Sequence, residues 1–568
     1  MDTPGSVNTA AWEQVRMGAQ GAVVSNHPLS SYAGIRILTN GGNAVDAAVA
    51  IGFALGVAEP QGSGIASDGF IMVHMKEINT VAVANGTGCA PLAATPERFA
   101  NGIVTSGILS VSVPGLCDAL LSAHERYGRL SLKECVAPAI EMCLAGVPQT
   151  HYQYKLAQKY DLLHKFPASA EIFTTRRQPL QPGEIRRNPD LARTYALIAE
   201  HGRDAFYTGP IAEALVKFSN DAGGILTKDD LARYKMVWQD PISTTYRGRT
   251  VYEAPPNSSG HVLLQGLNLI EHFDMASLGF NTSESVHVMV EAKKLAFADR
   301  EAFLADPDFV TIPIKGLVSK DYAAERVQLI NIERAIENVS AGNPWAHQSQ
   351  PNNSKGPFQR HNAKSREHHS DTTHYCVVDR WGNAVDGLQS LSSLFGSQVV
   401  CPGTGMLLNN RMNYWHLEAD HVDCLQPGKR VRHTMNPVMV FTAPPEAGGN
   451  LDMCCGTPGA DTQVQTNMQF ISAVYDHGYT VTESIHAPCW THSQAWMGSQ
   501  YPHKNINDMI IESRIDKGII EELSRLGHPA REVGPWDGMG SVGAIRIDKS
   551  GALLAASDPR RDGQALVY

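Results

Sequence analysis

A pair of threonines, Thr372 and Thr373, opens a strand-like run in the last third of the chain. The surrounding stretch reads DTTHYCVVDRWGNAV (371–385) and ends in a turn at residues 379–383. The segment before it, residues 343–371, has almost no aliphatic side chains and no periodicity, which predicts a flexible linker. A β-strand that begins with threonine directly after a dispensable linker constrains the fold more than any other feature of this sequence.

Such a threonine can become a chain terminus when the peptide bond before it is cut. Its freed α-amine can then act as the base for its own hydroxyl, so one residue supplies nucleophile and base. An α-ammonium has an ordinary pKa of about 7.7–8.0, which leaves a useful neutral fraction near pH 7. The alternative interpretation is that the Thr-Thr pair only starts a strand, since threonine favours strands.

The composition excludes several classes of protein. The 568 residues are 43% hydrophobic and 18% charged, which is typical of a globular chain with a large core. A net charge of −10 without a basic stripe argues against nucleic acid and anionic membrane surfaces as partners. The sequence has no apolar run of about 18 residues and no signal-peptide pattern, so we expect no membrane span and a cytoplasmic location. The ten cysteines lack CxxC spacing and are expected to be reduced and buried.

Apolar periodicity predicts mixed helices and strands. A buried helix is expected over 44–58, a strand over 69–75, mainly helices from 115 to 330, and a strand over 246–253 among them. After the linker we expect strands over 374–379, 384–390, 437–442, 450–456 and 542–548, with helices over 462–477 and 506–526. This pattern favours an α+β layered sandwich.

Several signals for metal or cofactor binding fail on their context. One polar cluster contains many metal-ligand residue types: His416, Glu418, Asp420, His421, Asp423 and Cys424. Its spacing fits neither HExxH nor a paired CxxC site, so we expect a solvent-facing loop and no metal. The GxGxxG match at 538–543 precedes a strand instead of a helix, and no GxSxG elbow occurs. No cofactor is therefore expected.

The chain resembles the γ-glutamyltransferase (γ-glutamyl transpeptidase, glutathione hydrolase) family of N-terminal-nucleophile (Ntn) hydrolases from about Gly21 to Pro559. The motifs that carry the resemblance are GGNAVDAAVA (41–50), GVAEPQGSGI (56–65), VSVPG (111–115), IAEHGRDAFYTGPIAEAL (198–215), YRGRTVYEAPPNSSG (246–260), EAKKLAFADR (291–300), DPDF (306–309), DTTHYCVVDRWGNAV (371–385), GMLLNNRMN (405–413), GTPGAD (456–461) and ASDPR (556–560). The resemblance implies an αββα four-layer sandwich that is autoproteolytically split into two intertwined subunits.

By the same resemblance, the cut falls between Asp371 and Thr372. Residues 1–371 would form a large subunit and residues 372–568 a small subunit, as pieces of one folded unit. The partners implied are the two subunits for each other, a small-molecule amide, and water as the acceptor. The oligomeric state of the processed pair, for which a homodimer is one candidate, stays open.

The residues of the catalytic machinery carry over by resemblance. Thr372 matches the family's nucleophile, and Ser390 falls where the family has a second hydroxyl. The oxyanion-hole amides fall on Gly459 and Ala460. Because backbone N–H groups do this work, an alanine is acceptable there if its φ is negative.

The expected substrate pocket departs from the family pattern. The positions that grip the γ-glutamyl group in the family are here Thr87, Ser392, Arg411, Tyr414, His433 and Thr434. The family's carboxylate-binding Arg becomes Thr87, and its ammonium-binding Asp becomes Tyr414. Burying a zwitterion without charge partners costs roughly several kcal/mol of binding free energy. This pocket is therefore not suited to an α-amino acid.

We therefore expect a self-processing hydrolase of a non-glutamyl amide, or of a related ester or carbamate, through an acyl-enzyme on Thr372. Arg411, Arg432 and His433 could bind a carboxylate placed differently, or the two arginines could be solvated surface charges. An authentic γ-glutamyltransferase or glutathione hydrolase is the alternative. A catalytically inactive binding protein with the same fold is a third interpretation.

Overall fold

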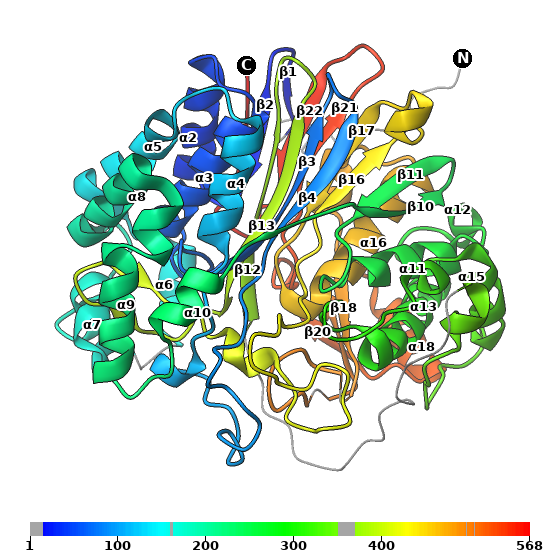
Figure 1. Cartoon of the computed structure of the whole chain (residues 1–568). Helices are drawn as coiled ribbons and strands as arrows, with labels where there is room; N and C mark the ends of the chain where they lie inside the picture. Colours follow the sequence, from blue (N-terminus) through cyan, green and yellow to red (C-terminus); the bar gives the residue numbers. More distant parts are fainter. Residues whose placement is uncertain (1–14, 160–162, 350–369, 496, 505) are drawn as a thin grey trace.

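The computed structural model describes residues 15–159, 163–349, 370–495, 497–504 and 506–568. Two large β-sheets face each other in the centre, and helices cover both outer faces (Figure 1). These α/β/β/α layers agree with the architecture that the resemblance implied. Most of the linker expected over 343–371 lies outside the described residues. In the part of the chain that is described, no helix combines the length and apolar character needed to cross a membrane.

The two central sheets are antiparallel throughout and have seven strands each. The first, which we call the β12 sheet, runs in the order β23 (Gln564–Val567), β2 (Ala22–Ser25), β12 (Ser370–Val378), β13 (Ala384–Ser393), β3 (Asp68–Met75), β4 (Thr80–Gly86) and β9 (Val237–Gln239). The second, the β16 sheet, runs in the order β1 (Arg16–Gly18), β22 (Leu553–Ser557), β21 (Gly543–Ile547), β17 (Leu451–Gly456), β16 (Val438–Phe441), β11 (Arg249–Glu253) and β10 (Ile242–Tyr246).

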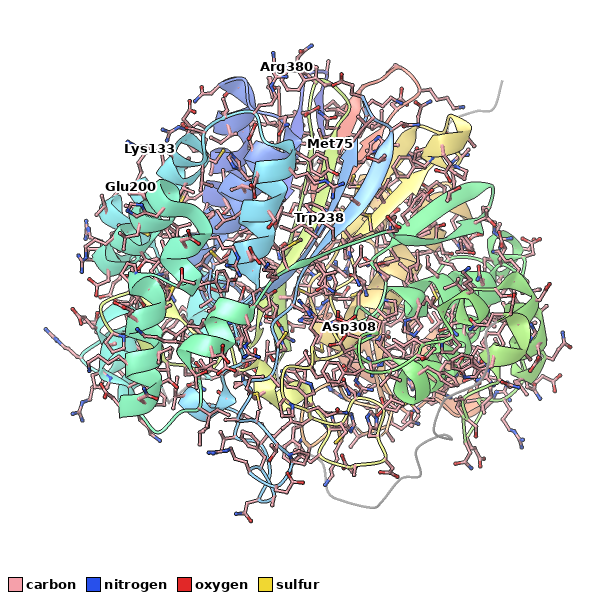
Figure 2. The ribbon with its side chains drawn as sticks, viewed as in Figure 1. Met75, Lys133, Glu200, Trp238, Asp308 and Arg380 are labelled. Carbon is pink, nitrogen blue, oxygen red and sulfur yellow. The ribbon has the colours of Figure 1, made fainter. Side chains whose placement is uncertain are left out.

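Each sheet has its own helical layer. The β12 sheet is covered by α2 (Pro28–Thr39), α3 (Ala44–Ala58) and α4 (Leu116–Tyr127), with α5 (Leu132–Ala145), α8 (Pro189–Tyr207) and α9 (Pro210–Asp221) outside them. The β16 sheet is covered by α11 (Gly260–Ile270), α16 (Gln463–Tyr475) and α17 (Val481–His486), with α13 (Ser283–Phe303) and α18 (Lys517–Leu526) outside them. Side chains fill the space between the layers, and Trp238 of β9 packs edge-on against Tyr127 of α4 with ring centroids 5.7 Å apart (Figure 2).

Shorter elements join these layers. The remaining helices are α6 (His151–Ala157), α7 (Pro167–Phe173), α10 (Lys228–Arg233), α12 (Met275–Leu278), α14 (Ile314–Leu317) and α15 (Lys320–Arg326). A three-stranded sheet contains β18 (Trp490–Ser493), β19 (Asp508–Glu512) and β20 (Ala530–Val533). Three two-stranded sheets pair β5 (Val147–Pro148) with β8 (Ile185–Arg186), β6 (Thr174–Thr175) with β7 (Gln178–Pro179), and β14 (Val400–Cys401) with β15 (Met406–Leu407).

Helix α3 lies behind the strand that begins with the Thr pair. All fifteen of its residues are buried, which explains why its sequence is apolar on every face. Asn43 and Asp46 form a capping box that satisfies the first free N–H groups and so fixes where the helix starts. The expectation of a buried helix over 44–58 is confirmed.

Two expected elements differ from the structure. The strand expected over 246–253 is the second half of a hairpin, in which β10 and β11 meet at Arg247 and Gly248, both with positive φ. The helix expected over 506–526 begins only at Lys517, because residues 508–512 form the central strand of the three-stranded sheet. Pairing on both sides outweighs the local helical pattern there. All ten cysteines are free, as expected, and eight of them are buried.

The two central sheets approach closely at His374 of β12. A Cβ built on Gly456 of β17 would lie 2.5 Å from Cδ2 of His374, and one built on Gly543 of β21 would lie 3.1 Å from Nδ1. Gly456 and Gly543 are register partners, so a pair of glycines makes room for the imidazole. Nε2 of His374 lies 3.1 Å from the Asp386 carboxylate of β13. The sheet spacing here depends on residues without side chains.

We expect the substitution Gly456→Ala to lower the free energy of unfolding by about 1–3 kcal/mol, because the added methyl group overpacks the contact with His374. Denaturant unfolding of the purified protein measures this change. Gly518→Ala on the exposed first turn of α18 is the matched control and should be neutral or slightly stabilising. Equal stability of Gly456→Ala and the unsubstituted protein would contradict the packing argument.

Candidate active site

The Thr pair lies at the start of β12, inside the molecule. Thr372 is 1% exposed, and its peptide bond to Asp371 sits in the ladder with β13. Asp371 pairs with Ser392 and Thr373 with Gln389, so Thr372 alone faces both Ser390 and Leu391. This irregularity is a β-bulge, a device that re-aims side chains next to functional sites. It brings the hydroxyl of Ser390 to the peptide bond before Thr372.

Ser390 makes three hydrogen bonds at this bond. Its Oγ donates to the carbonyl oxygen of Asp371 at 2.8 Å and accepts the N–H of Ser392 at 2.9 Å. Nη2 of Arg411 donates to the same Oγ at 3.1 Å. The carbonyl of the bond expected to be cut is therefore already polarised by a hydroxyl donor, which is itself held by a cation.

Asp371 is held by its own neighbour and by an arginine from the end of the chain. Its Oδ1 accepts the N–H of Thr372 at 2.8 Å and a bond from Nη2 of Arg561 at 2.6 Å. Nη1 of Arg561 also donates to the Thr372 carbonyl oxygen at 3.3 Å. Sequence reasoning missed Arg561, although it directly follows the ASDPR motif that carries part of the resemblance.

A second buried carboxyl group, Glu59 at the end of α3, lies beside the Thr pair. The Thr373 hydroxyl donates to its Oε2 at 2.5 Å, and Nη1 of Arg561 lies 3.8 Å from its Oε1. Burial raises the pKa of Glu59 to about 8, against the opposing effect of the Arg561 charge. Glu59 is inside the GVAEPQGSGI motif, which was the only signal in the sequence that could have marked it.

The expected oxyanion turn has a different backbone from the one we expected. Ala460 has φ of +50°, next to Gly459 at +123°, so the expectation of a negative φ at Ala460 is wrong. The physical reason is a tight turn in which the Thr462 N–H and hydroxyl both bond to the Gly459 carbonyl, at 2.9 and 2.7 Å. The turn continues into the 3₁₀ helix η7 (Ala460–Thr462), which packs against β12.

Four of the residues expected to bind substrate gather around Asp68, the first residue of β3. Nε of Arg411 lies 3.5 Å and Nε2 of His433 3.6 Å from Oδ2 of Asp68, while the guanidinium of Arg411 stacks 4.3 Å from the Tyr414 ring centroid. Thr87 precedes Gly88, whose N–H bonds to Oδ1 of Asp68 at 2.9 Å. Sequence reasoning missed Asp68, which no local motif marks.

This cluster balances its own charge. Arg411 is 0% exposed, so the alternative interpretation of it as a solvated surface charge is wrong. Its charge is compensated by the Asp68 carboxylate, as burial of an arginine requires. Burial, helped by the Arg411 charge, lowers the pKa of His433 to about 4, so His433 is neutral at neutral pH. Nη1 of Arg411 has no hydrogen-bond acceptor among the described residues.

The other expected binding residues are buried nearby and have protein partners. The Thr87 hydroxyl donates to Asn85 at 2.7 Å and accepts from Asn257 at 3.0 Å. The Ser392 hydroxyl bonds to Asn413 at 3.2 Å and accepts from Gln500 at 3.3 Å. Thr434 directly follows His433 and is also buried.

The solvent-facing loop that we expected after Tyr414 is only partly exposed: Glu418 and Asp420 face solvent, but the two histidines, Asp423 and Cys424 are buried. His416 and His421 are each 3% exposed, and their rings stack 3.4 Å apart. Both lie next to Glu301 of α13, whose carboxylate takes a 2.8 Å bond from Nη1 of Arg432. Arg432 is therefore neither a surface charge nor free for a substrate. Although Glu301, His416 and His421 could together reach a metal ion, the Arg432 guanidinium already supplies the cation.

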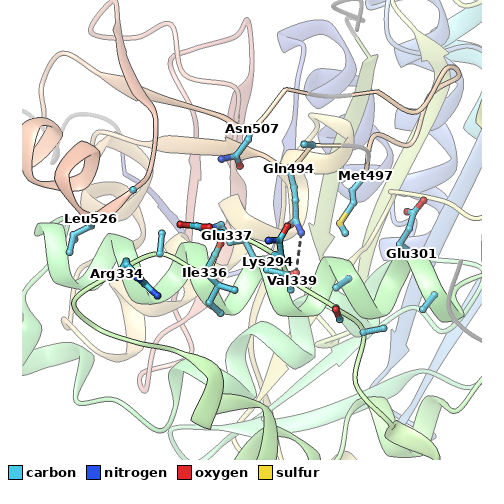
Figure 3. Close-up of a pocket in the computed structure, with 18 of the residues that line it drawn as sticks. Lys294, Glu301, Arg334, Ile336, Glu337, Val339, Gln494, Met497, Asn507 and Leu526 are labelled. Carbon is cyan, nitrogen blue, oxygen red and sulfur yellow. Dashed lines mark hydrogen bonds between the residues drawn. The ribbon is translucent and has the colours of Figure 1, made fainter. Parts of the chain in front are cut away.

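A cavity of about 840 Å³ has Glu301 in its wall (Figure 3). Its wall includes Lys294, Arg334, Gln494 and Met497 but none of the residues expected to be catalytic. Nζ of Lys294 is paired with Glu291 at 2.7 Å. The cavity therefore contributes no group to the peptide bond before Thr372.

We expect the substitution Ala460→Gly to raise the free energy of unfolding by up to about 1 kcal/mol, because glycine adopts positive φ without the cost that a Cβ adds. Thermal unfolding measures the difference. Ala460→Val is the matched opposite, because a β-branched residue is a severe outlier at positive φ, and it should be destabilising. A less stable Ala460→Gly variant would show that the turn has a different backbone.

Comparison with known proteins identifies the family of this chain. The family described as Gamma-glutamyltranspeptidase matches residues 30–568. The chain is 36% identical over 555 residues to the glutathione hydrolase-like YwrD proenzyme of Bacillus subtilis (strain 168), covering 97% of this chain and 99% of that one. It is 34% identical to the acylase ACY 1 proenzyme of Pseudomonas sp. (strain SE83), covering 96% and 93%.

A solved structure is similar over the whole length. The cephalosporin acylase from Bacillus halodurans superposes with a TM-score of 0.85 at 31% identity, covering 100% of this chain and 98% of that one. The match in sequence and the match in fold therefore extend over the same residues. The chain belongs to the γ-glutamyltranspeptidase family and is a hydrolytic enzyme of that family.

Proposed function

We propose that this enzyme cuts its own chain between Asp371 and Thr372 and then uses Thr372 as an N-terminal nucleophile against the amide bond of a small, non-glutamyl acyl compound. Residues 1–371 and 372–568 are then the large and small subunits. The single observation that carries the proposal is the Ser390 hydroxyl, which donates to the Asp371 carbonyl oxygen at the peptide bond before Thr372. The proenzyme names of the two relatives support the cut.

In the processed enzyme, the α-amine of Thr372 takes the proton from its own hydroxyl. The hydroxyl oxygen attacks the substrate carbonyl. The α-ammonium of Thr372 then passes that proton to the nitrogen of the substrate amide, which leaves as an amine. The proposed oxyanion donors are the backbone N–H groups of Gly459 and Ala460, within a turn that holds both residues at positive φ, and such donors typically contribute about 10²–10³ in rate. Ser390 stays beside the nucleophile as a second hydroxyl donor. Water then hydrolyses the ester on Thr372 and restores the free residue.

The charge pattern around Asp68 supports an acyl group that is not an α-amino acid. A γ-glutamyl group brings one ammonium and one carboxylate, and each needs a counter-charge when it is buried. Arg411 is already paired with Asp68, and a neutral Tyr414 stands where an ammonium would need an anion. Tyr414 and Trp415 instead belong to a buried apolar cluster with Met412 and Leu425. The acylase name of one relative fits this interpretation, and the glutathione hydrolase-like name of the other keeps γ-glutamyl amides as the comparison substrate.

The cut is tested by the substitution Thr372→Ala. We expect purified wild-type protein to give two fragments on a denaturing gel, with a new N-terminus that reads Thr-Thr-His-Tyr by mass spectrometry. Thr372→Ala should give one intact chain and no activity, because it lacks the hydroxyl that attacks in both reactions. Thr373→Ala is the matched control and should still be cut. A wild-type chain that is active and uncut would contradict the proposal.

The substrate class is tested with two p-nitroanilides that share a four-carbon acyl chain and differ by the ammonium and carboxylate groups of the γ-glutamyl compound. We expect kcat/KM for butyryl-p-nitroanilide to exceed that for γ-glutamyl-p-nitroanilide by about tenfold or more, since losing one buried counter-charge costs at least about 1.4 kcal/mol. Release of p-nitroaniline measures both rates. A higher rate with the γ-glutamyl compound would favour an authentic γ-glutamyl hydrolase and overturn the non-glutamyl assignment.

A further inference from the structure

Self-cleavage of the uncut chain needs a base other than the α-amine of Thr372. Before the cut, this nitrogen is part of an amide and cannot accept a proton. The Thr372 hydroxyl must still lose its proton when it attacks the Asp371 carbonyl, and the Thr372 nitrogen must gain one when it leaves. The following inference rests on the proposed function, because it concerns the same bond.

Most groups around the bond are unsuited to this role. Arg411 and Arg561 are cations without a lone pair to offer. The Ser390 hydroxyl donates its proton to the Asp371 carbonyl oxygen. The Oε2 atom of Glu59 already accepts the Thr373 hydroxyl, and with a pKa of about 8 this group is largely protonated near pH 7. His374 has its Nε2 directed to Asp386 between the two sheets.

The side chain of Asp371 lies beside the bond and keeps one carboxylate oxygen without a partner in the described part of the chain. Its carboxylate is 3% exposed, and Oδ2 has no hydrogen-bond partner among the described residues. Its Oδ1 is fixed 2.8 Å from the Thr372 nitrogen, which is the atom that leaves. Arg561 holds the same Oδ1 at 2.6 Å, so the free oxygen cannot easily turn away. A buried carboxylate oxygen without a hydrogen-bond partner lowers the stability of the folded state. Its presence beside a reacting bond therefore indicates a role in the reaction.

We propose that the Asp371 carboxylate is the general base and then the general acid of self-cleavage, and that it serves only this one turnover. Its Oδ2 takes the proton of the Thr372 hydroxyl as the Thr372 Oγ forms a bond to the Asp371 carbonyl carbon. The oxyanion receives the Ser390 hydrogen bond. The carbon–nitrogen bond then breaks, and the proton passes from the Asp371 side chain to the Thr372 nitrogen.

The product of this step is an ester between the Asp371 carbonyl and the Thr372 hydroxyl. One water molecule hydrolyses it and leaves a new α-carboxylate on Asp371 and a free hydroxyl on Thr372. The freed α-amine of Thr372 then becomes the base of the processed enzyme. The end of the large subunit is no longer tied to Thr372, so catalysis on substrate does not need the Asp371 side chain.

The test compares self-cleavage in Asp371→Asn, Asp371→Glu and Glu59→Gln full-length chains. Cleavage is followed over time on denaturing gels, and the new Thr372 terminus is counted by mass spectrometry. We expect Asp371→Asn to slow cleavage by about 10²–10⁴-fold, because asparagine keeps the shape and the Oδ1 acceptor but loses the base. Asp371→Glu, which retains a carboxylate, should cleave faster than Asp371→Asn. Glu59→Gln should slow cleavage less than Asp371→Asn.

Two further measurements separate chemistry from folding. Each substitution is also made in a Thr372→Ala chain, where thermal unfolding shows that the uncut protein stays folded and measures the stability that Asp371→Asn loses with the charge paired to Arg561. Any Asp371→Asn protein that has matured should show wild-type activity per Thr372 terminus. Cleavage of Asp371→Asn within about fivefold of the wild-type rate, or a larger loss in Glu59→Gln, would overturn this role for Asp371. An uncut wild-type chain would instead remove the proposed function itself.

Discussion

The pairing of β12 with β13 is the contact on which the whole site depends. Its bulge sets Thr372 opposite Ser390, and the ladder fixes the peptide plane that both hydroxyls face. The fully buried α3 packs against the two strands from one side. On the other side, the imidazole of His374 packs against Gly456 and Gly543 of the β16 sheet. A strand packed on both faces can hold a reacting bond within the small tolerance that chemistry needs.

Buried arginines organise the surroundings of this strand in pairs. Arg411 meets Asp68, Arg432 meets Glu301, and Arg561 meets Asp371. In each pair the partners are far apart in the sequence, so each ion pair forms only when the layers have assembled. Breaking one partner would leave a buried charge without compensation, which is more costly than losing the pair as a whole. These pairs therefore favour one arrangement of the site over looser alternatives.

The sequence was informative where a pattern is local. The apolar run of 44–58 predicted α3, and the Thr-initiated strand predicted β12, because periodicity and strand propensity act over short distances. It was misleading where burial depends on distant partners. The residues after Tyr414 look like a solvated loop, yet His416 and His421 are buried against Glu301, which pairs with Arg432. Asp68, Glu59 and Arg561 could not be assigned a role from spacing alone, since their neighbours come from other strands and helices. The positive φ of Ala460 likewise depends on the bonds of Thr462.

The order of strands has a consequence for what happens after a break at residue 371. In the β12 sheet, β23 and β12 flank β2, so strands from after the break enclose one from before it. In the other sheet, four strands from the later segment stand between β1 and the β11–β10 hairpin of the earlier one. Neither piece contains a complete hydrophobic core. Separating the pieces would break backbone hydrogen bonds between strands in both central sheets. After the covalent link is lost, the two pieces should therefore stay associated and unfold together as one cooperative unit.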